Sequence, residues 1–272
     1  MSEDNQPIIE VKNVTKKFGP PDNQLTAVND ISFKVYPGEI FAFLGPNGAG
    51  KTTTIKMLTT LLKPTSGDIR INGYNPVKNQ DEVRKSFGIV FQDPSLDDEL
   101  TAYENMYFHG VLYHVESKLR QKRIEELLKI VDLWDKKNDL VKTFSGGTKR
   151  RLEIARALIH HPKIFFLDEP TLGLDPQTRN QIWQYILNLN QKEGITVFFT
   201  THYMEEAEKI AKWIAIIDYG KIVKTGTVES LKQETQTTSL EEVFLKLTGK
   251  KIREEEASPL DRMRLRRKFR HH

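Results

Sequence analysis

Nine consecutive residues in the first fifth of the chain have the composition of a phosphate-binding loop. Positions 45–52 match the pattern G-x-x-x-x-G-K-[ST], in which glycines let backbone N–H groups turn inward around phosphate oxygens. Lys51 would add a positive charge at the β- and γ-phosphates, and the Thr52 hydroxyl is a potential Mg²⁺ ligand. The predicted nucleotide-binding residues of this loop are Gly45, Pro46, Asn47, Gly48, Ala49, Gly50, Lys51, Thr52 and Thr53.

The sequence around this loop predicts the elements that would position it. Residues 40–44 read as a short buried strand, and a helix is expected from Lys51 to about Leu61. The amino end of such a helix adds its positive dipole end to the site. This strand–loop–helix order favours a nucleotide site over a chance glycine-rich turn.

Two acids follow a second apolar segment. Residues 164–167 predict a strand that runs directly into Asp168 and Glu169. If this strand ends beside the phosphate loop, Asp168 lies near Mg²⁺ and Glu169 can act as a general base toward the attacking water. Taken alone, the pair could also be the solvated end of an ordinary strand.

A serine and two glycines open a long helical stretch between these motifs. Ser145, Gly146 and Gly147 precede the helix expected over 149–160. A serine hydroxyl and bare amides at a helix amino end form a second potential anion site. Taken alone, such a segment is more often an ordinary N-capped helix than an anion site.

The motifs together resemble, in composition and in order, those of the nucleotide-binding subunit of an ATP-binding cassette (ABC) transporter. Gln92, the run Gly173–Asp175 and His202 complete the set, and the resemblance extends from about Ile8 to Thr248. It implies an ATPase that binds ATP with Mg²⁺. The joint match is far more specific than any single motif.

The resemblance also assigns roles to individual residues, and for Gln92 and His202 it is the sole source of those roles. It implies that Gln92, Lys51, Glu169 and His202 are catalytic. Gln92 would contact Mg²⁺ and the attacking water and sense the transmembrane partner, and His202 would contact the γ-phosphate. The implied metal site consists of Thr52, Gln92 and Asp168.

Other residues resemble those that act between two subunits or on the base. Ser145, Gly146 and Gly147 would meet the ATP held by a second ATP-binding subunit, and Asp175 would cross the same interface. Phe18 occupies the position of an aromatic ring that stacks on adenine. This chain has phenylalanine there instead of the usual tyrosine, which removes a hydroxyl but keeps the ring face.

The signature departs from its commonest form, and the departure indicates a branch of the family. Phe144 and Thr148 replace the usual leucine and glutamine, whereas the Ser-Gly-Gly core is intact. Together with residues 201–208 and 239–249, the variant resembles drug-resistance-type exporters and the lipid-transporting subfamily A. The implied cargo is a hydrophobic compound, drug or lipid.

Alternating strands and helices after residue 160 predict an α/β fold with a mostly parallel sheet. The resemblance makes it a P-loop (RecA-like) core with an N-terminal antiparallel β subdomain and an α-helical subdomain. The expected ATPase domain is 1–248, with the helical subdomain at about 93–160 and a charged tail at 249–272. Further strands are expected at 8–14, 28–36, 68–71, 88–91, 196–200 and 213–217, helices at 176–189 and 205–211, and a helix-capping box at Thr101–Glu104.

Composition excludes several classes of protein. The 272 residues contain no cysteine, so disulfide frameworks, cysteine-ligated zinc and thiol catalysis are ruled out. The longest unbroken apolar runs, such as 40–44, have five residues, far below the roughly 20 of a membrane span. The polar, acidic start does not resemble a secretory signal. We therefore expect a separate transmembrane permease chain, with this subunit peripheral to the cytoplasmic face of the cell membrane.

The net charge of +4 comes from the end of the chain. Six basic residues and no acid lie in 262–272, and without them 35 basic residues face 37 acidic ones. The body is therefore not expected to bind nucleic acid. The tail is either a solvated end or a contact for anionic lipid headgroups, and His271 and His272 are either native or a cloning remnant.

Two other functions deserve comparison. A non-transport ABC ATPase acting on nucleic acid or ribosomes is the alternative; such proteins usually carry two cassettes or long coiled coils, and this chain carries neither. Co-purification with nucleic acid or ribosomes would favour it. A GTP-binding switch is disfavoured because the guanine-specific N-K-x-D pattern is missing.

Both half-sites are present in one chain, so a homodimer is the simplest assembly.

Overall fold

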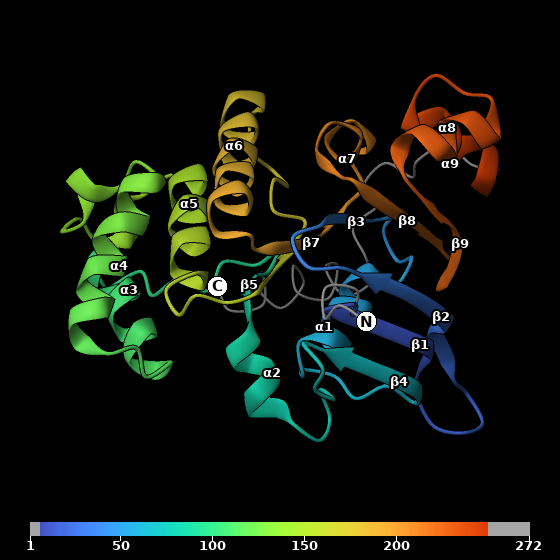
Figure 1. The fold of residues 1–272 in the computed structure, drawn as a ribbon, viewed down its shortest axis with the longest axis horizontal. Helices are drawn as coiled ribbons and strands as arrows, with labels where there is room; N and C mark the ends of the chain where they lie inside the picture. The colour runs from blue at the N-terminus through green and yellow to red at the C-terminus, as the bar shows by residue number, and fades with distance from the viewer. Residues whose placement is uncertain (1–5, 250–272) are drawn as a thin grey trace, which may run out of the picture.

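A six-stranded sheet runs through the middle of the protein (Figure 1). One of its central strands leads directly into the phosphate loop. The computed structural model describes residues 6–249. The strand order is β5-β6-β7-β3-β8-β9, in which all neighbours are parallel except β8 and β9. The strands are β3 (Ile40–Leu44), β5 (Phe87–Val90), β6 (Ile164–Asp168), β7 (Thr196–Thr201), β8 (Trp213–Asp218) and β9 (Lys221–Gly226).

The inner strands are apolar along their whole length because both faces of the sheet are covered. In β3, Ala42 and Leu44 belong to one hydrophobic core and Phe41 and Phe43 to the other. All five residues of β3 are buried. A continuous apolar run of this kind, rather than an alternating one, is typical of a parallel strand covered on both sides.

A small antiparallel sheet covers one face of the large one. Its order is β2-β1-β4, formed by β1 (Ile9–Phe18), β2 (Leu25–Val35) and β4 (Ser66–Ile71). Phe33 of β2 stacks on Phe41 with ring centroids 5.6 Å apart, and Phe41 stacks on Phe198 at 5.5 Å. These stacked rings join the small sheet to the large one.

Helices cover both faces of the sheet: α1 and α2 pack on the same side as the small sheet, and the remaining helices contribute to the core on the other side. Helices α3, α4 and α5 pack together at the left of Figure 1, and α8 and α9 lie at the upper right. The α-helices are α1 (Lys51–Leu58), α2 (Gln80–Ser86), α3 (Ala102–Leu112), α4 (Ser117–Ile130), α5 (Gly146–Ala157), α6 (Pro176–Glu193), α7 (Met204–Ile210), α8 (Val228–Thr235) and α9 (Leu240–Thr248), with short 3₁₀ turns η2 (Trp134–Lys136) and η3 (Val141–Thr143).

The structure confirms the α/β class, the mostly parallel sheet and the antiparallel N-terminal sheet. It also confirms the capping box at Thr101, whose hydroxyl accepts from the Glu104 amide while the Glu104 carboxylate accepts from the Thr101 amide. The pattern did not predict α2, β9 or α8. Strand β9 lies at the sheet edge with alternate side chains exposed, so its lysine-rich sequence resembles a polar loop.

The remaining expectations concern membrane-spanning helices and the basic tail. Within residues 6–249, no helix has the length and apolar character that crossing a membrane requires. The basic tail segment, including 262–272, lies outside the described residues, as do His271 and His272.

Candidate nucleotide-binding and hydrolysis site

The carboxyl ends of three neighbouring strands bring the predicted motifs together. Strand β3 leads into the phosphate loop, β6 ends at Asp168, and β7 ends one residue before His202. Because β7 lies between β6 and β3, and Asp168 pairs with Thr200 in the sheet register, all three strand ends reach the same edge. This is the edge where open α/β sheets bind ligands.

The phosphate loop ends at a helix whose first amides have no side-chain cap. Gly50 is the N-cap of α1, has a left-handed backbone with φ of 109°, and offers no side-chain hydrogen bond. The first amides of a helix have no partner within the helix. Their N–H groups and the positive end of the α1 dipole are therefore available to an anion.

Lys51 is buried and held by three oxygen atoms. Its ammonium donates to the carbonyl oxygen of Gly45 at 2.7 Å and lies 3.4 Å from that of Pro46. It also forms an ion pair with Glu169 Oε1 at 3.0 Å. Only 5% of the Lys51 surface is exposed, so the charge acts in a poorly solvated environment where electrostatic effects are strong.

Glu169 joins the lysine to His202. The Nδ1 atom of His202 lies 2.9 Å from Glu169 Oε2, which assigns the hydrogen to Nδ1 because the carboxylate can only accept. Burial by itself would raise the pKa of Glu169. The hydrogen bond from His202 and the charge of Lys51 outweigh burial and hold that pKa below its usual value, so Glu169 is ionised at neutral pH.

Asp168 is surrounded by hydroxyl groups. Its Oδ1 accepts from Thr200 Oγ1 at 2.7 Å and from Thr52 Oγ1 at 3.3 Å. Burial raises the pKa of Asp168, against the effect of these hydrogen bonds. The sequence did not single out Thr200, although its place at the end of the strand next to β6 would have indicated this contact.

The donor set fits a hard divalent cation. Thr52 and Asp168 present oxygen atoms side by side, which suits Mg²⁺. Among residues 6–249, no three His, Cys, Asp or Glu side chains gather in a cluster that could hold a metal ion. Few protein ligands are needed here, because Mg²⁺ keeps several waters and uses one or two carboxylates plus substrate phosphates.

Two glycines of the phosphate loop differ in whether the structure leaves room for a side chain. An added Cβ at Gly50 would lie 2.6 Å from the carbonyl oxygen of Ala27, whereas one at Gly48 would meet nothing within 4 Å. Both residues have positive φ. We expect Gly48→Ala to lower the free energy of unfolding by about 1 kcal/mol and Gly50→Ala by about 2 kcal/mol or more. Denaturant unfolding measures both, and equal losses would contradict the prediction.

Ser145, Gly147 and Asp175 lie on one surface formed by two helix amino ends. Ser145 caps α5 and Asp175 caps α6, each accepting from the amide three residues later. A Cβ on Gly147 would meet the Thr178 methyl carbon at 2.6 Å, so the two helix starts touch. Ser145, Gly146 and Asp175 are exposed. Within the described part of the chain, no hydrogen bond joins this surface to the phosphate loop.

Phe18 and Gln92 are placed differently from the buried residues. The Phe18 ring is 40% exposed, and the Lys16 ammonium lies 5.1 Å from its centroid. The sequence predicts a strand ending at Phe91, next to Gln92, but β5 ends at Val90, because Phe91 and Gln92 give their carbonyl oxygens to Arg150. Gln92 is exposed, and no hydrogen bond within residues 6–249 joins its side chain to Asp168 or Glu169.

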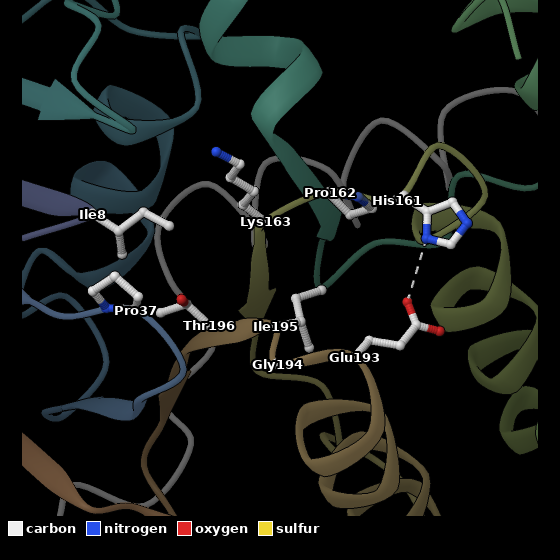
Figure 2. A pocket seen from close by; sticks show the side chains of 9 residues that line it. All are labelled: Ile8, Pro37, His161, Pro162, Lys163, Glu193, Gly194, Ile195 and Thr196. Atoms are coloured by element: carbon white, nitrogen blue, oxygen red, sulfur yellow. Dashed lines mark ion pairs between the residues drawn. The ribbon is translucent and has the colours of Figure 1, made fainter. Parts of the chain in front are cut away.

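A cavity of about 450 Å³ lies at the opposite edge of the sheet (Figure 2). Its lining includes Lys163 and Thr196, at the amino ends of β6 and β7, together with His161 and Glu193. None of the predicted site residues lines it. The cavity is therefore separate from the phosphate loop.

Comparison with known proteins supports the reading of the motifs. The family model described as "ABC transporter" matches residues 28–172. The chain is 42% identical to the linearmycin resistance ATP-binding protein LnrL of Bacillus subtilis (strain 168) over 224 residues, which are 82% of this chain and 70% of that protein. It is 39% identical to the daunorubicin resistance ATP-binding protein DrrA3 of Streptomyces coeruleorubidus over 227 residues, 84% of this chain and 70% of that protein.

A solved structure shares the fold. It is the dimeric post-hydrolysis state of an ATP-binding cassette bound to ADP and Pi, with a TM-score of 0.73 and 31% sequence identity. The similarity covers 80% of this chain and 98% of that one. The shared fold thus includes nearly the whole of that cassette.

Proposed function

The chain belongs to the ABC transporter family, and from that premise we propose that it is the ATP-hydrolysing subunit of an exporter. The observation that carries the proposal is the set of contacts from Lys51 through Glu169 to His202. These residues come from three distant segments and meet beside uncapped helix amides. Such an arrangement can bind a triphosphate and activate a water next to it.

In the proposed mechanism, Lys51 exchanges partners. Backbone N–H groups of the loop 45–53, in which Pro46 has none to give, and the Lys51 ammonium bind the β- and γ-phosphates of ATP, while Phe18 stacks on adenine. As Lys51 turns to the phosphates, Glu169 loses the ammonium group that pairs with its Oε1. Its carboxylate can then accept a proton from the attacking water, with His202 holding the other oxygen.

Thr52, Asp168 and Gln92 are the proposed ligands of Mg²⁺. When bound, the ion supplies positive charge that neutralises the phosphate oxygens. Thr200 holds Asp168 in place through its 2.7 Å hydrogen bond. The side-by-side oxygens of Thr52 and Asp168 support this assignment.

Two copies of the chain form the proposed active unit. Ser145, Gly146 and Asp175 are exposed, Gly147 lies beside them, and among residues 6–249 no hydrogen bond joins these four to the phosphate loop. They would therefore complete the site of a second copy and bind the γ-phosphate held there. The dimeric cassette bound to ADP and Pi, which shares the fold, supports this assembly.

We further propose how the subunit is placed in a transporter. The relatives named for resistance to linearmycin and daunorubicin support export of a hydrophobic compound, drug or lipid through a separate permease. The subunit would lie peripherally on the cytoplasmic face of the cell membrane. Residues 1–248 would form the ATPase domain, about 93–160 its helical subdomain facing the permease, and 249–272 a charged tail.

A sizing column tests the dimer. The Glu169→Gln variant should elute at twice the monomer mass with saturating ATP and Mg²⁺, and as a monomer with ADP, because the second surface binds the γ-phosphate. The double variant Glu169→Gln/Ser145→Ala is the matched control and should dimerise far less. A Glu169→Gln variant that stays monomeric with ATP would contradict the shared-site arrangement.

A further inference from the structure

Three side chains of α5 form hydrogen bonds with the short loop that follows β5. Arg150, Glu153 and Arg156 are spaced three residues apart, so they lie on one side of the helix. Their partners lie in the loop 91–95, close to 60 residues earlier in the chain. We call these three residues the α5 clamp.

Arg150 holds two successive backbone carbonyls. One guanidinium nitrogen donates to the oxygen of Phe91 at 2.6 Å and the other to that of Gln92 at 3.1 Å. Arg150 also pairs with Glu153 at 3.2 Å. The fixed fork of a guanidinium suits this geometry, and an ammonium group could not reproduce it.

Glu153 and Arg156 hold the same loop at Ser95. Glu153 Oε1 accepts from the Ser95 amide at 2.7 Å. Arg156 donates to the Ser95 carbonyl at 2.9 Å and to its hydroxyl at 2.5 Å. With Arg150, they bind the loop 91–95 on both sides of Asp93.

Two of the three clamp residues are buried. Arg150 is 6% exposed and Glu153 is 2% exposed, whereas Arg156 is half-buried. The loop that they hold follows β5, the neighbour of β6, and β6 ends at Asp168. Burial lowers the pKa of Arg150, while the charges of Glu153 and Asp168 act in the opposite direction. Buried charges are retained only when paired, so these bonds act together.

A second set of bonds reinforces the connection just before the helix begins. The amide of Val141 donates to the Leu100 carbonyl at 2.9 Å and that of Lys142 to the Asp98 carbonyl at 3.1 Å. The Lys149 ammonium lies 2.6 Å from Asp98 Oδ1. The loop after Gln92 is thus fixed to both sides of Ser145.

We propose that Arg150, Glu153 and Arg156 are positioning residues that join the loop carrying Gln92 to the helix beginning at Ser145, so that the two ATP sites of a dimer respond together. The inference rests on the proposed function, in which Gln92 acts on the ATP of its own chain and Ser145 on the ATP of the other copy. Because the clamp makes them one rigid body, a displacement at one site moves the contact at the other.

The full chain with Glu153→Gln tests this coupling. For the wild-type dimer we expect ATP hydrolysis to rise with a Hill coefficient between 1 and 2, the latter being the number of sites. In Glu153→Gln the Hill coefficient should fall toward 1 and kcat should fall about tenfold, because the Ser145 end is no longer held in place. ATP affinity of the dilute monomer should change less than about twofold, since Lys51 and its loop are untouched.

Three further variants separate coupling from stability. Arg150→Lys keeps the charge but not the fork, and Ser95→Ala removes only one hydroxyl from an exposed residue; both should lower the Hill coefficient, Ser95→Ala least. Arg123→Gln is the matched control: it removes another buried arginine from its ion pair, with Glu193 at 3.1 and 3.2 Å, at the edge drawn in Figure 2. It should lower the unfolding temperature without changing the Hill coefficient.

The outcomes are distinguishable. If Glu153→Gln keeps the wild-type Hill coefficient, including a shared value of 1, the coupling role is overturned while the ATPase function stands. If Arg123→Gln lowers the Hill coefficient as much as Glu153→Gln does, the effect is one of general stability and the coupling role is again overturned. If the wild-type protein does not hydrolyse ATP, the proposed function itself fails.

Discussion

Replacing Lys51 by alanine is expected to lower the ATP hydrolysis rate about 10²–10³-fold. This is the typical cost of losing one preorganised hydrogen-bond donor that stabilises negative charge in the transition state. Lys51 is the buried cation of the phosphate loop, placed between two loop carbonyls and Glu169. Its loss should also weaken ATP binding, because the loop then relies on backbone amides alone. Phosphate release and nucleotide titration measure the two effects separately.

The Lys51 variant needs a stability control, because the substitution leaves the buried Glu169 carboxylate with its hydrogen bond to His202 but without the Lys51 ammonium. Thermal unfolding of Lys51→Ala without nucleotide gives that baseline, and Lys51→Met, which keeps most of the side-chain volume, should unfold closer to wild type. A Lys51 variant that hydrolyses ATP at the wild-type rate would overturn the assignment of the phosphate loop and everything that depends on it.

Glu169→Gln is expected to separate binding from hydrolysis. Loss of a general base should lower kcat by about 10²–10⁴-fold. ATP affinity should stay equal or become tighter, because the carboxylate now 3.0 Å from Lys51 would no longer compete with phosphate for that ammonium. Single-turnover kinetics and nucleotide titration of the same sample measure both quantities.

Glu193→Gln is the matched control for the Glu169 variant. Like Glu169, Glu193 forms an ion pair with a basic side chain, here Arg123, but it lies at the other edge of the sheet (Figure 2). It should keep hydrolysis within a few-fold of wild type. If Glu169→Gln instead weakened ATP binding strongly while hydrolysis per bound ATP persisted, Glu169 would be a structural partner of Lys51 and not the base.

Much of the fold was predictable because its signals are local. The apolar run 40–44, the capping box at Thr101 and the Asp175-Pro176 helix start each lie within a few residues, and the structure confirms all three. Strand β9 was not predictable in the same way. It is a half-exposed edge strand, and its pairing with β8 cannot be read from its lysine-rich sequence.

The same difference between local and long-range signals decides which parts of the site could be predicted. The types and order of Lys51, Asp168, Glu169 and His202 predicted that they would share one site. The structure places the four at one edge of the sheet, with Glu169 in contact with both Lys51 and His202. The α5 clamp could not be predicted, because arginine and glutamate on a helix usually mark a solvated face. Only the packing of α5 against the loop 91–95 turns that face inward.

The central position of β3 has a consequence for how the chain is made. Both of its neighbours, β7 and β8, lie more than 150 residues further along the chain. At a translation rate of about 5–20 residues per second, the apolar segment 40–44 leaves the ribosome about 8–30 s before either partner strand does. We expect nascent chains to depend on chaperones during this interval, and ATP to stabilise only those chains whose last third has already emerged.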